Sequence, residues 1–373
     1  MDALLRWPSG LEWLAVIPML SLLVFGHELG HFVAALLMGV RVEEFGFGYP
    51  PRALVLFEHR GVKYTLNWLP FGGFVRMAGE EQGFNDPGSL AAKPPWKRFV
   101  VFAAGPTMNA LLAVLLYIGI FSAGIPEASG PILIDQVAPG SPAAEVGLQS
   151  GDILTRIGDT PVRSFADVQH ATAAHIGEPV EVTVSRGEEE FTTTLVPRRP
   201  EETPPDQGAM GITISIEEVE EIVYRRVGPL QTISLGFQRA LSLVVAMVEG
   251  LTQLVLSVFT PSVPAPEGGV AGPVGIARLA GEVARGGWLP FLDLTGFLSL
   301  NFALINFLPL PALDGGHIVF VILEWVRRGK RVPPEKEALV HLAGMVILIG
   351  LMLVISYLDV VRWIQGEAIL PGG

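Results

Sequence analysis

The 373-residue sequence contains no cysteine. Disulfides and thiolate-ligated metal sites are therefore excluded, and any bound metal must rely on histidine and carboxylate ligands. Charged residues are scarce at 17%, and there is no basic excess, since the formal net charge is -12. That balance argues against nucleic-acid binding, which needs a surplus of Lys and Arg. What remains is apolar, with 50% hydrophobic residues and a mean hydropathy of +0.47, and this predicts an integral membrane protein.

Four apolar stretches are long enough to cross a bilayer, which takes about 20 helical residues. They comprise residues 11–40, 99–125, 294–326 and 338–357. A further apolar segment, residues 233–259, carries polar groups at spacings that favour a helix lying at the membrane interface, while a fifth crossing stays open. The predicted fold class is a polytopic α-helical membrane protein with about four transmembrane helices.

The first apolar stretch contains the motif His27-Glu28-Leu29-Gly30-His31. On a helix the two histidines fall on one face, and Glu28 can reach a water held by a metal between them. Ionisable groups at bilayer depth are costly and usually mark a functional site. The alternative, a structural cluster bonded to neighbouring helices, would have to neutralise the glutamate at a cost of several kcal/mol, about the penalty for burying an unpaired charge. The motif therefore predicts a metal hydrolase centre inside the membrane.

Basic residues gather in two loops, residues 41–98 and 327–336, whereas residues 127–226 are mainly acidic. The positive-inside rule places both basic loops in the cytoplasm and the acidic segment on the opposite side. Both termini are then expected outside the cytoplasm. The first and third crossings run in the same direction in this topology.

This orientation predicts a third metal ligand. His27 lies 13 residues before Val40, and Asp314 lies 13 residues before Arg327, so the two side chains are expected at similar depth. A carboxylate facing two histidines completes three ligands and leaves a fourth tetrahedral position for water, as catalytic zinc requires. The same ligands also suit non-haem iron, but the adjacent glutamate and the helical motif favour zinc.

Two further regions are predicted to contain β-structure. Residues 54–57 and 62–68 are β-prone runs that flank a turn, and they predict a small sheet beside the membrane. This sheet is either a packing element or an edge to which an extended substrate adds. Residues 131–196 form a soluble α+β domain with a capped helix at residues 164–175, followed by a polar linker at residues 200–207.

Four motifs together resemble the site-2 protease family, most closely its bacterial regulator-of-sigma-E type. They are His27-Glu28-x-x-His31, Gly105-Pro106-Thr107-Met108-Asn109, Gly272-Pro273-Val274-Gly275-Ile276, and the run from Asn306 to Gly316 that includes Leu313-Asp314-Gly315. The soluble domain resembles a single PDZ domain. The residues that carry this second similarity are Gly140-Ser141-Pro142-Ala143-Ala144 and Gly147-Leu148-Gln149-Ser150-Gly151-Asp152.

The resemblance implies a role for each polar residue of these motifs. It implies Zn2+ held by His27, His31 and Asp314, with Glu28 as the catalytic base. Asn109 and Asn306 are expected to grip the substrate backbone or stabilise the oxyanion, although hydrogen bonding between helices is an equal alternative. His317 lies one turn beyond Asp314 and either hydrogen-bonds a ligand or caps the polar end of its helix.

The implied function is intramembrane cleavage of single-pass membrane proteins in the plasma membrane, with anti-sigma factors and remnant signal peptides as substrate classes. The active site is expected toward the cytoplasmic side. The PDZ-like domain is expected on the extracytoplasmic side, where it binds a peptide or protein. The competing hypothesis is a non-catalytic membrane adaptor that binds peptides and keeps a metal for stability. An adaptor would have no need of Glu28.

The predicted organisation divides the chain into seven parts. They are residues 1–40, the first transmembrane helix with His-Glu-x-x-His; 41–96, a cytoplasmic, membrane-associated β loop; 97–126, the second helix; 127–200, the PDZ-like extracytoplasmic domain; 201–290, a linker and an amphipathic helix; 291–328, the third helix with Leu-Asp-Gly; and 329–373, a cytoplasmic loop and the fourth helix.

Overall fold

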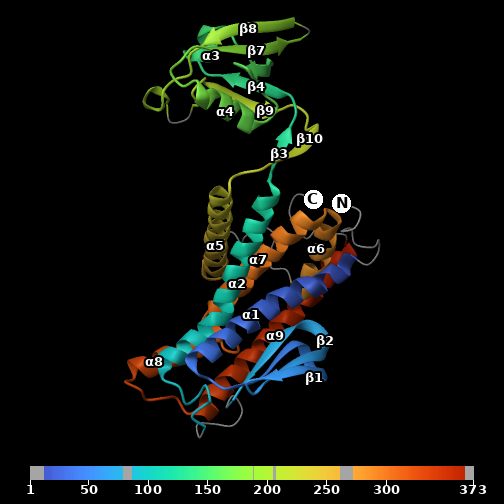
Figure 1. Cartoon of the computed structure of the whole chain (residues 1–373), viewed down its shortest axis with the longest axis vertical. Coiled ribbons are helices and arrows are strands. Elements are labelled where there is room, and N and C mark those ends of the chain that lie inside the picture. The colour runs from blue at the N-terminus through green and yellow to red at the C-terminus, as the bar shows by residue number, and fades with distance from the viewer. Residues whose placement is uncertain (1–11, 79–85, 188, 205–206, 261–271, 366–373) are drawn as a thin grey trace. The chain divides into compact units, whose positions relative to one another are not determined.

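The computed structural model describes residues 12–78, 86–187, 189–204, 207–260 and 272–365 (Figure 1). The chain divides into two compact units. The helical unit is built from Met1–Phe121 and Pro229–Gly373, and the β-rich unit comprises Ser122–Gly228. The β-rich unit is therefore an insertion between two parts of the helical unit. Both termini, expected outside the cytoplasm, lie outside the described residues.

The helical unit is made of apolar helices and a small sheet. Its helices are η2 (Glu12–Ala15), α1 (Val16–Met38), α2 (Pro95–Ala123), α5 (Pro229–Phe259), α6 (Pro273–Arg285), α7 (Trp288–Phe307), α8 (Asp314–Val326) and α9 (Pro334–Gln365). Five described helical stretches are long and apolar enough to cross a membrane: Glu12–Met38, Pro95–Ala123, Pro229–Ser257, Trp288–Phe307 and Pro334–Gln365. Residues 233–259, for which the sequence favours a helix at the membrane interface, belong to one long helix, α5. This helix has the length and composition of a membrane crossing.

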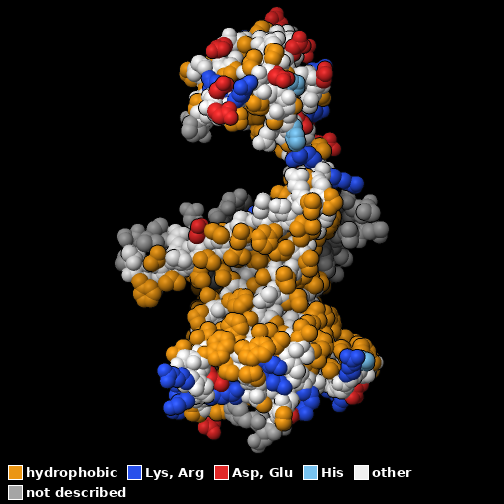
Figure 2. Space-filling view, turned by 60° about the vertical axis from the view of Figure 1, so that its left-hand side comes forward, with side chains coloured by type: hydrophobic (Ala, Val, Ile, Leu, Met, Phe, Trp, Pro, Cys, Tyr) orange, Lys and Arg blue, Asp and Glu red, His pale blue; other side chains and the backbone are white. Residues whose placement is uncertain are grey.

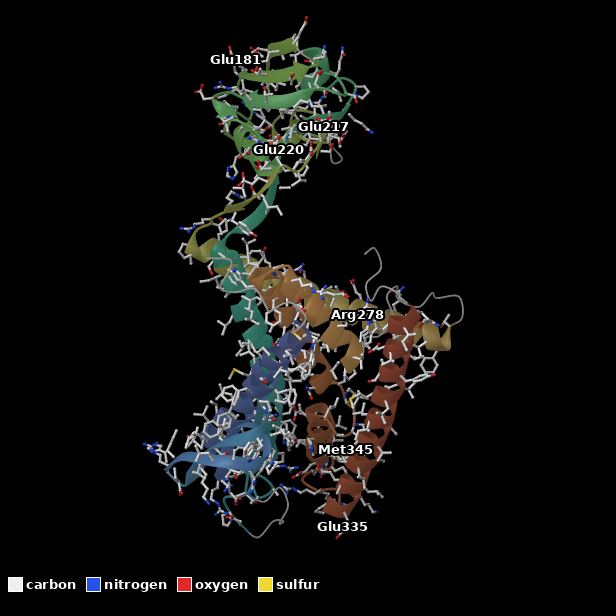
Figure 3. The ribbon with its side chains drawn as sticks, turned by 90° about the vertical axis from the view of Figure 1, so that its right-hand side faces the viewer. Glu181, Glu217, Glu220, Arg278, Glu335 and Met345 are labelled. Carbon is white, nitrogen blue, oxygen red and sulfur yellow. The ribbon has the colours of Figure 1, made fainter. Side chains whose placement is uncertain are left out.

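The surface of the helical unit is apolar over a broad band, with Lys and Arg side chains gathered at one end (Figure 2). In α9, the side chains of Val346, Ile347 and Leu353 are 63%, 68% and 62% exposed. So much exposed apolar surface is unfavourable in water and favourable in contact with lipid. Figure 3 shows Glu335 of α9 at one end of this unit and Arg278 of α6 at the other.

The third predicted crossing is broken into two helices. α7 ends at Phe307 and α8 begins at Asp314. Pro309 and Pro311 lie between them, and each lacks the backbone N–H that a continuous helix needs. Ala312 adopts a left-handed conformation with φ of 75°. The sequence predicts residues 294–326 as one crossing, whereas the structure places Asp314 as the first residue of a new helix.

α1 and α7 run in the same direction. Met19 and Leu23, in the first half of α1, share a buried apolar cluster with Leu294 and Leu298 of α7. The second half of α1 therefore lies beside the later part of α7 and the break that follows it. This is the relative direction that the charge pattern of the loops predicts.

The sheet predicted between the first two long apolar helices is present and is larger than expected. β1 (Val42–His59) and β2 (Val62–Met77) pair antiparallel. Both strands bend, so that residues 42–47 of β1 lie between residues 62–66 and residues 73–77 of β2. The stretch of residues 73–77 is an edge of this sheet, because among the described strands none pairs with its other side.

One buried carboxylate joins the parts of this sheet. Glu44 lies in the central stretch, and its side chain is only 3% exposed. It accepts hydrogen bonds from Arg52 Nε and Thr65 Oγ1, both at 2.9 Å, and Arg76 Nη2 lies 3.2 Å from its Oε2 atom. Each of these partners comes from a different stretch of β1 or β2. A buried carboxylate with several charged and polar partners is stable and fixes the arrangement of the strands.

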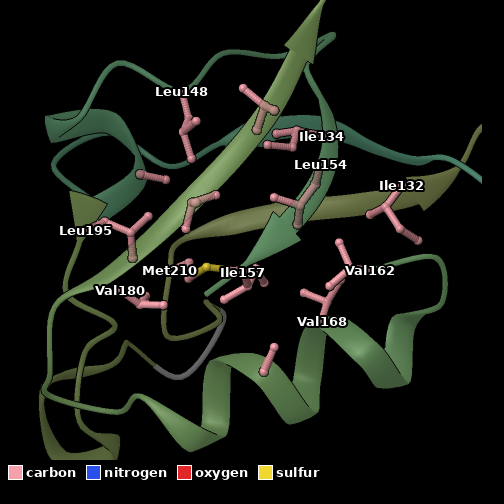
Figure 4. Packing of buried hydrophobic residues seen from close by; sticks show 14 residues of the cluster. Ile132, Ile134, Leu148, Leu154, Ile157, Val162, Val168, Val180, Leu195 and Met210 are labelled. Carbon is pink, nitrogen blue, oxygen red and sulfur yellow. The ribbon is translucent and has the colours of Figure 1, made fainter. Parts of the chain in front are cut away.

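The β-rich unit is a sheet covered by a helix. Its strands are β4 (Ile132–Val137), β5 (Ile153–Ile157), β6 (Thr160–Pro161), β7 (Val180–Arg186), β8 (Glu189–Leu195) and β9 (Ile212–Ile216), in the order β8-β7-β5-β4-β9 with β6 beside β5. The short helix α3 (Pro142–Glu145) and the longer α4 (Phe165–Ala174) complete it. Alternate apolar residues of the strands form the core with Val168 of α4 (Figure 4).

The boundary of this unit differs from the prediction. The predicted domain ends at residue 200, and residues 201–290 are predicted as a linker and an amphipathic helix. In the structure β9 pairs with β4 and forms an edge of the sheet. Beyond it, β10 (Glu221–Arg225) pairs antiparallel with β3 (Ile125–Ser129) in a separate ribbon. β9 and β10 are each only five residues long, and each follows a polar stretch, so neither stands out in the sequence.

An ion pair between the buried Asp152 and the partly exposed Arg186 holds the Gly147–Asp152 turn to the sheet. The Asp152 side chain is 1% exposed. It accepts hydrogen bonds from Arg186 Nε at 2.7 Å, Arg186 Nη2 at 2.8 Å and the backbone N–H of Gln149 at 2.8 Å. The Arg186 guanidinium holds the pKa of Asp152 below its ordinary value. The carboxylate is therefore part of the scaffold of this unit.

We expect Asp152→Asn to destabilise the β-rich unit by about 1–3 kcal/mol, since it weakens a buried, charge-assisted hydrogen-bond network. Hydrogen exchange of the β5 and β7 amides in the full-length protein measures this loss at neutral pH. Because the pKa of the folded state is depressed, the stabilisation is complete above about pH 4 and disappears as the pH falls through that lower value. The difference between wild type and variant should shrink over the same acid range.

Glu220→Gln is the matched control. It breaks the contact between Glu220 and Arg163, whose side chains are 48% and 59% exposed. Exposed ion pairs contribute about 0–1 kcal/mol. Equal loss of protection in both variants would contradict a structural role for the pair of Asp152 and Arg186.

Candidate metal centre

The structure brings together the three predicted metal ligands. His27 and His31 lie one turn apart on α1, and Asp314 begins α8. The Nε2 atom of His27 is 3.0 Å from Asp314 Oδ2, and that of His31 is 3.4 Å from Asp314 Oδ1. The two Nε2 atoms are 3.1 Å apart. All three side chains thus point their donor atoms at one small volume within the helical unit.

These residues fit a zinc ion. The Asp314 Oδ2 atom is buried and accepts no hydrogen bond. Donor atoms bound to a tetrahedral zinc at about 2.0–2.1 Å lie roughly 3.3 Å from one another, close to the separations found here. Two imidazoles and one carboxylate form a common donor set of catalytic zinc sites with an open fourth position.

His31 is oriented by the backbone of α2. Its Nδ1 atom is 2.8 Å from the carbonyl oxygen of Val101. A carbonyl oxygen only accepts, so His31 Nδ1 carries the hydrogen and donates it. The Nε2 atom, which faces Asp314, then keeps its lone pair free for a metal.

His27 has a different partner on its outer side. Its Nδ1 atom is 3.4 Å from the side-chain amide of Asn109 in α2. Asn109 is fully buried, and its Oδ1 atom has no hydrogen-bond partner. The structure thus places Asn109 against a candidate ligand rather than on an accessible surface.

Glu28 lies beside the ligand cluster without joining it. Its Oε2 atom accepts a hydrogen bond of 3.2 Å from the backbone N–H of Val75, in the edge stretch of the sheet. This contact ties the carboxylate to β2. A carboxylate held next to a metal site but outside the ligand set is placed to exchange a proton with a water there.

Two glycines allow α1 and α2 to approach closely at this level. A Cβ atom at Gly105 would lie 2.7 Å from His31 Cε1 and 2.8 Å from His27 Cε1. A Cβ atom at Gly30 would lie 2.8 Å from the Cβ atom of Met108. Side chains at these positions would push the helices apart, as is common where small residues line helix contacts in membranes. Gly105 therefore belongs to the wall of the metal centre.

The remaining predicted residues have other partners. Asn306 Nδ2 donates a hydrogen bond of 3.0 Å to the Phe302 carbonyl within its own helix. His317 Nδ1 lies 3.6 Å from Glu337 Oε1, and its ring stacks on Phe102 with centroids 4.8 Å apart. Neither residue is hydrogen-bonded to the three candidate ligands.

His341 of α9 is a residue that the sequence analysis missed. Its Nδ1 atom accepts a hydrogen bond of 2.9 Å from the backbone N–H of Ala312, two residues before Asp314. It thereby supports the left-handed turn that presents Asp314. The signal was available, because His341 is an ionisable residue in an apolar run, the criterion that marks His27.

His317, Glu337 and His341 also form a second cluster of potential ligands. The two imidazole rings are stacked 3.8 Å apart and only 14° from parallel. Nitrogens of parallel stacked rings do not converge on one point, whereas a metal lies in the plane of each imidazole that binds it. His341 Nδ1 is, moreover, already an acceptor. The geometry therefore favours a structural role for this cluster, as a support for the turn before Asp314, over a second metal site.

Comparison with known proteins shows the family. The family model described as Peptidase family M50 matches residues 15–351. The chain therefore belongs to peptidase family M50, and it is an integral membrane zinc metalloprotease of the site-2 protease type. Membership of a peptidase family argues against the competing hypothesis of a non-catalytic membrane adaptor.

Curated relatives match along nearly their whole length. A protein of Clostridium perfringens is 36% identical over 342 residues, covering 91% of this chain and 96% of the relative. One of Fusobacterium nucleatum is 32% identical, covering 94% of this chain and 98% of the relative. Both carry the name "Putative zinc metalloprotease".

Among solved structures, the PDZ domain of an SdrC-like protein from Listeria monocytogenes is 22% identical. It covers 23% of this chain and 87% of its own, with a TM-score of 0.18.

We expect Gly105→Ala to lower the zinc content of the purified protein, because the new methyl group would displace both imidazoles. Zinc affinity should fall roughly tenfold or more, the effect of disturbing groups that orient metal-bound histidines. Gly119→Ala, in the same helix, is the control, since a Cβ atom there meets nothing within 4 Å. Equal zinc-to-protein ratios in the two variants would contradict the placement of Gly105.

Proposed function

We propose that this protein is an intramembrane endopeptidase that hydrolyses peptide bonds within the transmembrane segments of single-pass membrane proteins. The observation that carries the proposal is the convergence of His27, His31 and Asp314 inside a unit of membrane-spanning helices. Anti-sigma factors and remnant signal peptides are the substrate classes, reached after another protease has trimmed the ectodomain. In this proposal the three residues hold the zinc ion.

The residues around the ligands then have separate tasks. When bound, zinc supplies a Lewis acid that polarises the scissile carbonyl and makes a water molecule more acidic. Glu28 takes the proton of the attacking water on its carboxylate and passes it to the leaving amine. Its hydrogen bond from Val75 holds the carboxylate at this position before substrate arrives. Asn306, at the end of α7 beside the break, is the candidate contact for the substrate backbone.

The sheet supplies a surface for an extended substrate. A peptide bond in a helix is shielded by its own hydrogen bonds, so the substrate has to unwind before it is cut. Residues 73–77 form a strand edge whose Val75 N–H faces Glu28. An extended segment that adds to this edge would lie next to the catalytic base. Of the two interpretations of the sheet, a packing element or an edge to which substrate adds, the proposal adopts the second.

Charge supports a topology for the proposed enzyme. The loop after α8 contains Arg327, Arg328, Lys330 and Arg331, and Figure 2 shows Lys and Arg gathered at one end of the helical unit. By the positive-inside rule this end faces the cytoplasm, and the active site is nearer to that side. The β-rich unit is then extracytoplasmic, where it excludes substrates with bulky ectodomains and binds a peptide or protein ligand.

Glu28→Gln should abolish cleavage while zinc stays bound. Loss of a general base costs about 10²–10⁴-fold in rate. The assay uses purified full-length protein in lipid vesicles with a single-pass transmembrane peptide, and mass spectrometry locates the cut. Chelator should also stop the wild-type reaction. Glu43→Gln, which removes an exposed carboxylate of β1, is the control and should cleave normally. A Glu28 variant that cuts at the wild-type rate would refute the assigned base.

Removing the β-rich unit should widen the substrate range. Ile125 and Arg225 are cross-strand neighbours, so a short Gly-Ser linker can replace residues 126–224. Peptides with a trimmed ectodomain should be cut as before, and peptides carrying a folded ectodomain should become substrates. The same deletion combined with Glu28→Gln shows that any new cleavage comes from this site. Unchanged selectivity would count against a filter.

A further inference from the structure

The two candidate histidine ligands are supported differently on their outer sides. Both direct Nε2 toward Asp314, so a metal would be bound through Nε2 in each case. His31 Nδ1 donates to the carbonyl of Val101 at 2.8 Å. His27 Nδ1 faces the amide of Asn109 at 3.4 Å, with the amide nitrogen as the nearer atom.

The chemistry of imidazole sets a requirement on this second contact. A neutral histidine that offers the Nε2 lone pair carries its hydrogen on Nδ1, which then needs an acceptor. The amide nitrogen of Asn109 is itself a donor, so in the orientation shown two donors would face each other. The oxygen of the same amide is buried without a partner. A half-turn of the amide exchanges the two atoms within nearly the same volume.

We propose that Asn109 is the positioning residue of His27, and that its Oδ1 atom accepts the hydrogen bond from His27 Nδ1–H when the metal is bound. The amide thereby fixes both the tautomer and the ring orientation of this ligand. This inference rests on the proposed zinc site. It differs from the sequence-based expectation that Asn109 grips substrate, because the buried amide faces a candidate ligand.

The surroundings hold Asn109 in this place. Its backbone carbonyl accepts a buried hydrogen bond of 2.8 Å from Ser299 Oγ of α7. On the other side, a Cβ atom at Gly26 of α1 would lie 3.7 Å from Asn109 Oδ1. Asn109 thus contacts α7 through its backbone carbonyl and α1 through its fully buried amide.

The test measures zinc affinity, by competition with a chelator of known affinity, on full-length protein in detergent. Asn109→Leu keeps the shape and removes the acceptor, and its dissociation constant for zinc should rise about 10–100-fold. Asn109→Asp keeps an acceptor at the same position and should restore affinity to within a few-fold of wild type. Should Asn109→Leu fail to fold, Asn109→Ala gives the same comparison with a smaller side chain.

Tyr117→Phe is the matched control, because it removes the hydrogen bond from the Tyr117 hydroxyl to the Asp293 carbonyl, which joins the same two helices, α2 and α7, without touching Asn109. Its zinc affinity should equal that of wild type. Cobalt substitution gives a second readout: the visible absorption bands of the bound ion should change in Asn109→Leu and return in Asn109→Asp.

Asn109→Leu protein that binds zinc as tightly as wild type would overturn the inference, even where cleavage is lost, since that pattern would indicate a substrate contact. Failure of the proposed function is distinguishable. If the wild-type protein binds zinc and His31→Ala binds it equally well, the metal site itself is wrong. If His31→Ala loses the zinc and Asn109→Leu keeps it, only the role of Asn109 is wrong.

Discussion

The structure depends on one constraint: polar and ionisable groups inside an apolar helical unit have to satisfy one another. His27, His31 and Asp314 meet inside this unit, where His27 Nε2 and His31 Nε2 lie 3.0 Å and 3.4 Å from the Asp314 carboxylate. His31 Nδ1 is in turn hydrogen-bonded to the Val101 carbonyl of α2, and Glu28 is hydrogen-bonded to the sheet. The cost of leaving any of these groups alone in a low-dielectric environment favours one arrangement of the helices.

The last helix contributes to this arrangement without supplying a candidate ligand. His341 supports the turn before Asp314, and a Cβ atom at Gly344 would lie 2.8 Å from the Pro311 carbonyl oxygen. Farther along α9, Asp359 accepts hydrogen bonds of 2.9 Å from the backbone N–H groups of Gly272 and Gly275 at the start of α6. A carboxylate there satisfies the unpaired N–H groups of a helix N-terminus. Two glycine- and proline-containing motifs are thus held by the same helix.

Much of the site could be predicted from the sequence, because its residues break local rules. Three ionisable residues in an apolar helix and two prolines before an aspartate each point to a special structure. The direction of α7 followed from loop charges. The length of α5 could not be predicted, because polar residues along an apolar helix are compatible both with a helix at the membrane interface and with a membrane crossing. His341 and the orienting contact of Asn109 depend on which helices touch, and a single sequence carries no record of that.

The β-rich unit shows a similar division. Its α+β character and its capped helix were predicted from strand-like runs and turn residues, whereas β9 and β10 were not, because each is short and gains its stability by pairing with a distant strand. The ribbon formed by β3 and β10 has a consequence for the evolution of such proteins. Entry and exit of the inserted unit occur at neighbouring points, Ile125 and Arg225, so a whole module can be gained, lost or exchanged at a single junction. The inserted unit can therefore vary while the helical unit stays the same.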